Sequence, residues 1–68
     1  MKYAVVYEQA PRNWAAYVPD LPGCVATGRT RAEARRRIRE AIGMHLEAMR
    51  ARGEDVPETS AAVEVIEV

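Results

Sequence analysis

The sequence contains few residues of the kinds that hold small extracellular domains or metal sites together. It has a single cysteine, Cys24, so no disulfide can form within the chain. Cys24 and the only histidine, His45, are too few soft ligands for a structural zinc site. One unpaired cysteine is typical of a reducing compartment. We therefore expect neither a disulfide nor a metal or other cofactor, and a cytoplasmic location.

Net charge and long apolar runs are also missing. Ten basic and ten acidic residues balance each other, which argues against a general nucleic-acid binder. No apolar run approaches the roughly 20 residues that span a bilayer. The first two residues lead into a predicted strand, residues 2–8, and not into a signal peptide with an apolar centre. We expect a protein without a membrane partner.

With 68 residues the chain forms one domain, residues 1–68. A core of this size rarely contributes more than about 3–5 kcal/mol of stability by itself. Since disulfides and metals are excluded as supports, self-association is the remaining route. We therefore expect a homo-oligomer, a dimer or a tetramer.

Three short strands and one long helix are expected along the chain. Alternating apolar residues predict strands over 2–8, 14–18 and 24–27, joined as an antiparallel meander. Thr30 with Glu33 forms a capping box that starts a helix, and Gly53 should end it. Residues 61–68 predict a last strand that returns across the helix to lie parallel to the first strand. The expected fold is α+β, β-β-β-α-β, with strand order 3-2-1-4.

The stretch from Tyr17 to Gly28 contains the most distinctive local chemistry. Pro19 and Pro22 fix the backbone on either side of Asp20 and Leu21, and Gly23 permits the turn to close. The sequence therefore predicts a stiff corner, and stiff loops on small scaffolds often carry function. A purely structural role, in which Asp20 accepts hydrogen bonds from backbone N–H groups in a turn, is favoured over a role as a metal ligand.

Two further candidate sites are weak. Cys24 and His45 could approach each other, but no third group is evident that would orient a catalytic base. Arginines crowd the first half of the helix. The preferred interpretation is a solvated helix face, and the alternative is a docking surface for an acidic partner or an RNA backbone.

Several motifs together resemble one known family. The run Val18-Pro-Asp-Leu-Pro-Gly-Cys24, the Thr30-x-x-Glu33-Ala34 helix start and the segment Gly53-Glu-Asp-Val-Pro57 resemble the HicB antitoxins over nearly the whole chain. The resemblance implies a partial RNase H-like fold. It also implies a non-enzymatic protein that binds and occludes a small HicA-like mRNA interferase toxin. Longer members add a DNA-binding domain that these residues do not include, so we expect no DNA binding from this chain alone.

Within this resemblance we expect the corner and the acidic connector after the helix to contact the partner. The expected contact residues are Trp14, Tyr17, Pro19, Asp20, Leu21, Pro22, Asp55 and Glu58. Two alternatives stay open: a stand-alone oligomeric module of the same fold without a toxin, and a residual metal-dependent nuclease. The nuclease reading lacks the several carboxylates that metal-ion catalysis requires.

Overall fold

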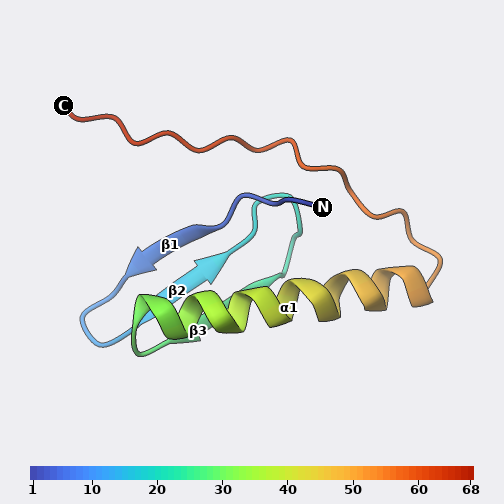
Figure 1. The fold of residues 1–68 in the computed structure, drawn as a ribbon, viewed down its shortest axis with the longest axis horizontal. Helices are drawn as coiled ribbons and strands as arrows, with labels where there is room; N and C mark the ends of the chain where they lie inside the picture. The colour runs from blue at the N-terminus through green and yellow to red at the C-terminus, as the bar shows by residue number, and fades with distance from the viewer.

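The computed structural model describes all of residues 1–68 and consists of one sheet covered by one helix (Figure 1). The sheet contains β1 (Val6–Gln9), β2 (Trp14–Tyr17) and β3 (Val25–Gly28), and the helix is α1 (Arg31–Ala51). The strands pair antiparallel in the order β1-β2-β3. The predicted α+β class, three-stranded meander and single helix are therefore confirmed, with strands somewhat shorter than expected.

The register of the strands decides which side chains the helix covers. Tyr7 lies opposite Ala16, and Ala16 lies opposite Ala26, so these three residues share one face. Ala16 is fully buried on that face, where α1 packs chiefly against β3 and also against β2. On the other face, Val6 lies opposite Tyr17 and Tyr17 opposite Val25. That second face has no covering element (Figure 1).

The core lies between the helix and the sheet and is small. It consists of Ala16, Val18, Leu21, Cys24, Ala34, Ile38 and Leu46. Close approach of α1 depends on small residues, because a Cβ added at Gly28 would lie 2.5 Å from the backbone nitrogen of Ala34. One face of the helix lies against the sheet, where Ala34, Ile38 and Leu46 are buried.

The ends of α1 follow the expected capping chemistry. The Thr30 hydroxyl accepts a hydrogen bond from the Glu33 backbone N–H at 3.0 Å. The Glu33 carboxylate accepts from the backbone N–H of Arg29 at 3.3 Å, one residue before the position that a capping box uses. At the other end Gly53 has φ 73°, and the Glu54 N–H donates to the Met49 carbonyl at 2.9 Å. A left-handed glycine with this long reverse bond is a Schellman-type ending.

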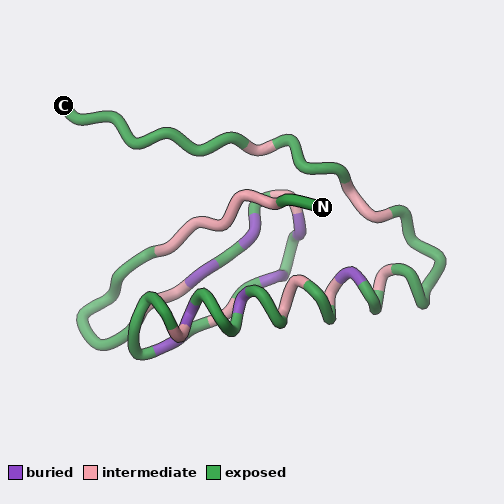
Figure 2. The backbone as a smooth tube through the Cα atoms, in the orientation of Figure 1, coloured by how far each residue is buried: buried purple, intermediate pink, exposed green.

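The expected fourth strand is the main difference between the sequence prediction and the structure. The C-terminal tail (residues 54–68) contains neither helix nor strand, and none of the 33 backbone–backbone hydrogen bonds involves a residue after Glu54. The tail nevertheless runs beside β1 in the same direction, as a parallel strand would (Figure 1), and is mostly exposed (Figure 2). Strand order 3-2-1-4 is therefore not formed here, and the RNase H-like relationship stays a prediction.

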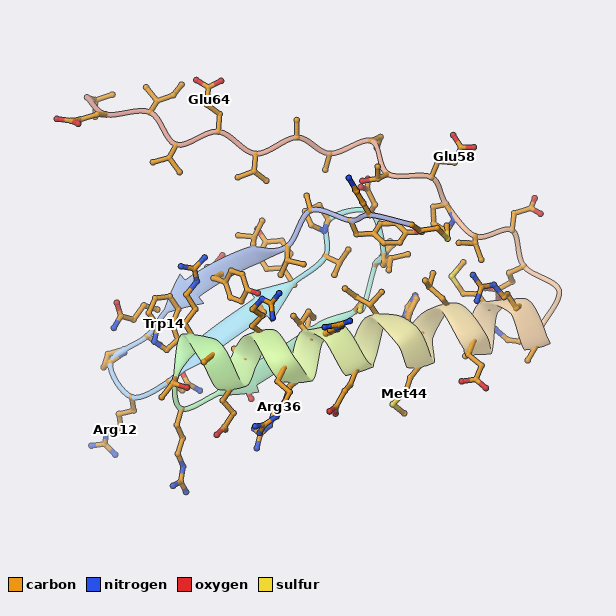
Figure 3. The ribbon with its side chains drawn as sticks, viewed as in Figure 1. Arg12, Trp14, Arg36, Met44, Glu58 and Glu64 are labelled. Atoms are coloured by element: carbon orange, nitrogen blue, oxygen red, sulfur yellow. The ribbon has the colours of Figure 1, made fainter.

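The orientation of the tail explains why it does not pair with β1. Val63 and Val65 line a shallow cavity of about 300 Å³ together with β1 side chains and Trp14, whereas Glu64 points away from the sheet (Figure 3). The tail thus turns its side chains toward β1. Because hydrogen-bonding groups of a strand lie perpendicular to its side chains, the tail backbone does not face the free edge of β1.

Candidate partner-binding site

The corner loop (residues 18–24) joins β2 to β3 and is held closed by its own backbone. The Leu21 N–H donates to the Val18 carbonyl at 3.1 Å, and the Cys24 N–H donates to the Leu21 carbonyl at 3.0 Å. The Val18 N–H in turn donates to the Cys24 carbonyl at 3.1 Å. Gly23 has φ 83°, a conformation that favours glycine. The expected stiff corner is therefore present.

Burial within the corner loop corrects the prediction for Leu21. Its side chain is 1% exposed and is one of the two largest fully buried side chains. Leu21 therefore fixes the loop to the core and is not available as an apolar anchor for a partner. Pro19 and Pro22, on either side, are exposed, so the outer surface of the corner is formed by the two prolines.

Asp20 binds the C-terminal tail to the corner loop. Its Oδ1 accepts from the Ser60 hydroxyl at 2.8 Å, and its Oδ2 accepts from the Ser60 N–H at 3.1 Å. Oδ2 also accepts from the Ala61 N–H and the Thr59 hydroxyl, both at 3.2 Å. These hydrogen bonds, led by that of the Ser60 hydroxyl, hold the pKa of the Asp20 carboxyl below its ordinary value of 3.8. Asp20 does accept backbone N–H bonds as expected, but from the tail and not from its own turn.

Two further contacts fix the tail near this loop. The Tyr3 hydroxyl donates to the Pro57 carbonyl, and the Val56 side chain packs against the core. Residues 56–61 are thus attached at three points. Asp55 precedes these attachments and Glu58 lies between them; both are expected contact residues, and both are exposed. The sequence reading missed Tyr3, Thr59 and Ser60, since their partners lie about 40 residues or more away along the chain.

The two aromatic candidates lie on opposite faces of the sheet. Trp14 is half-buried on the face that carries the helix and lines the same cavity as Val63 and Val65. Tyr17 lies on the open face and is 37% exposed. They therefore do not form one aromatic anchor, and Tyr17 is the one that lies on the open face. The strict alternation of strand residues would have separated them at the sequence level.

Cys24, the last residue of the corner loop, lies close to His45 of α1. Both line an open cavity of about 330 Å³ with Val25 and Met44. Burial raises the pKa of the Cys24 thiol, which disfavours the thiolate that a nucleophile requires. No group of three or more histidine, cysteine or acidic side chains is placed to hold a metal ion. A thiol that stays protonated is a poor nucleophile, so the environment of Cys24 does not favour the catalytic interpretation of this pair.

The arginine-rich half of α1 is partly occupied by structural contacts. The Arg31 guanidinium carbon lies 4.8 Å from the centre of the Tyr7 ring, a cation–π contact. Arg37 donates to the Thr27 carbonyl at 3.1 Å and pairs with Glu33 at 3.2 Å. Other arginines of the helix, including Arg36, extend into solvent (Figure 3).

The single helix α1 is not apolar over a stretch long enough to cross a membrane.

Comparison with known proteins places these features in a family. The chain is 36% identical over 62 residues to a UPF0150 protein of Thermoplasma acidophilum, and this alignment covers 90% of the chain and 90% of the relative. It is 35% identical over 60 residues to an uncharacterized 14.9 kDa protein from the rep-hol intergenic region of Haemophilus phage HP1. That match covers 88% of the chain but only 45% of the phage protein, so the chain spans less than half of that relative. No solved structure matches the chain significantly.

The sequence profile of one family matches almost the whole chain. The profile describes a HicB-like antitoxin of bacterial toxin–antitoxin systems and aligns with residues 3–67. The matched range includes the whole sheet, the helix, the corner loop and nearly all of the tail that Asp20 holds. The chain therefore belongs to the HicB-like antitoxin family.

Proposed function

We propose that the protein is a non-catalytic antitoxin that binds a small HicA-like mRNA interferase and covers its RNA-binding surface. The single observation that carries this proposal is the family match over residues 3–67. An antitoxin role implies a toxin as partner, and a HicA-like toxin is the finer identification that we propose.

The proposed contact surface combines the exposed part of the corner loop with the tail that Asp20 attaches to it. Pro19, Pro22 and Tyr17 would supply apolar contact from a preset backbone, which lowers the ordering cost of binding. Asp55 and Glu58 would face the basic surface with which an RNA-cleaving toxin meets phosphate. Leu21 is buried and is not part of this surface. Trp14 would contribute only where it lines the cavity beside Val63 and Val65. Asp20 acts by positioning the tail.

Charge reversal of the two tail acids tests this surface. We expect Asp55→Lys combined with Glu58→Lys to slow association with a HicA-like toxin, most strongly at low salt, because complementary charge acts mainly on the association rate. The control is Glu47→Lys, which changes an exposed acid on α1 and should bind like the wild type. Surface plasmon resonance at two salt concentrations measures both rates. Equal association rates for all variants would exclude this surface and favour the arginine face of α1.

A second candidate function is a stand-alone oligomeric module of the same fold. The exposed apolar tail favours it, because such a segment fits contact with another copy as well as contact with a toxin. Co-purification from the native host followed by mass spectrometry separates the two functions. A small basic protein recovered in stoichiometric amount supports the antitoxin, whereas the chain recovered alone supports the module.

A further inference from the structure

The last seven residues of the chain form an apolar segment without a partner. Four of the eight exposed large apolar side chains lie there: Val63, Val65, Ile66 and Val68. Val65 is 94% exposed and Ile66 is 68% exposed. The segment is rich in β-branched residues, which favour strands, and residues 62–68 make no backbone–backbone hydrogen bond. An extended, apolar segment with free backbone groups is a template for pairing with another strand.

The segment is also held in place at its start. The Ala61 N–H donates to Asp20, which fixes the chain immediately before residue 62. Val63 and Val65 then face β1 and Trp14 across the cavity, while Glu64 points outward (Figure 3). By strand alternation, Ile66 and Val68 share the outward side with Glu64. The side of the segment with Val63 and Val65 is therefore partly covered by β1 and Trp14. The side with Glu64, Ile66 and Val68 faces solvent.

We propose that residues 62–68 pair antiparallel with the same residues of a second copy, across a two-fold axis. A two-fold interface uses the same patch on both copies and requires that patch to be self-complementary. Here each copy supplies the same extended apolar strand with free hydrogen-bonding groups on both edges. The pairing would satisfy these groups and would add buried area to a core that is small for a chain of this length.

The two glutamates of the segment select the register. With Val65 opposite its own counterpart, all seven residues pair, Glu64 meets Ile66, and Glu67 meets Val63. A shift by one residue toward the C-terminus brings Glu64 directly opposite Glu67, where like charges destabilise the pair. The structure and sequence therefore favour the register centred on Val65, which also places two apolar side chains at the axis.

Sedimentation velocity of the full chain and of two matched variants tests the pairing. We expect a dimer for the wild type and a monomer for Val65→Asp, which places two carboxylates at the axis. Met44→Asp is the control, since Met44 is a comparably exposed apolar residue (71%) that lies on α1; it should remain a dimer. Circular dichroism checks that both variants fold. A monomeric wild type, or a dimer that Val65→Asp leaves intact, would overturn the proposal.

Disulfide trapping tests the register independently. Directly opposed residues of an antiparallel pair have Cα atoms about 4.5–5.5 Å apart, within the range that a disulfide bridges. Val65→Cys should therefore cross-link to its counterpart under mild oxidation, whereas Val63→Cys should not. Cys24 does not interfere, because it is buried. Protection of the amides of 62–68 from hydrogen exchange in a strictly monomeric sample would instead place the segment on its own β1 and contradict the inference.

Discussion

Asp20 and Ser60, forty residues apart in the chain, are joined by two hydrogen bonds of 2.8 and 3.1 Å. This pair attaches the C-terminal tail to the corner loop between β2 and β3. It ties residues 59–61 to the loop that carries the exposed prolines, and it fixes the position from which the apolar segment 62–68 extends. The proposed toxin surface and the proposed pairing of two copies therefore both depend on Asp20.

Replacement of Asp20 should release the tail in a pH-dependent way. Because hydrogen bonds lower the pKa of Asp20 in the folded protein, its stabilising effect is present above the ordinary pKa and is lost as pH falls through the lowered value. We expect Asp20→Ala to have a lower melting temperature than the wild type at neutral pH. The difference in melting temperature between the two proteins should shrink when the pH is lowered below 3.8, the ordinary pKa of the Asp20 carboxyl.

Amide exchange reports the same effect locally. The amides of Ser60 and Ala61 should exchange faster in Asp20→Ala, while those in the centre of α1 keep their protection. The control is Asp55→Ala, which removes an exposed acid of the tail whose side chain forms no hydrogen bond with the protein. Unchanged exchange at Ser60 and Ala61 in the Asp20 variant would show that the attachment does not exist in solution.

Leu21 should matter for stability and not for contact with a partner. Leu21→Ala removes a fully buried side chain, and we expect a loss of about 2–5 kcal/mol in the free energy of unfolding. Pro22→Ala, next to it but exposed, should lose much less. Urea unfolding followed by circular dichroism measures both. A Leu21→Ala variant as stable as Pro22→Ala would be incompatible with the observed packing.

Two glycines next to or within α1 should respond in opposite directions to the same substitution. At Gly28 an added Cβ would meet the Ala34 nitrogen at 2.5 Å and the Glu33 carbonyl carbon at 2.9 Å. Gly28→Ala should therefore destabilise, by about 1–3 kcal/mol as overpacked sites do. Gly43→Ala lies in the helix with open space around the new methyl group and should stabilise by roughly 0.5–1 kcal/mol. Thermal unfolding of the two variants checks the contrast.

Local signals in the sequence accounted for most of the fold. Alternation gave the three strands, and the Thr30 cap and Gly53 ending gave the helix, because each signal acts within a few residues. The state of residues 61–68 was not predictable in this way. Their apolar pattern is that of a strand, but whether a strand forms depends on which backbone lies beside it. In the single chain the side chains of Val63 and Val65 face β1, so the hydrogen-bonding groups of the tail backbone do not.

The candidate site was predictable only in part. Proline and glycine spacing gave a stiff corner, since these residues restrict the backbone directly. Their pattern did not reveal that Leu21 points into the core or that Asp20 binds Ser60, because both facts depend on distant elements. Trp14 and Tyr17 were separable from the sequence by strand alternation, which places residues three apart on opposite faces.

Inhibition of RNA cleavage tests the antitoxin proposal most directly. A HicA-like toxin encoded beside the gene for this protein would be purified, and its cleavage of RNA measured while the full chain is added in increasing amounts. We predict that cleavage falls to the background level at a fixed stoichiometric ratio and that the chain alone cleaves no RNA. Full toxin activity in the presence of excess folded chain, with no complex detected, would contradict the proposed function.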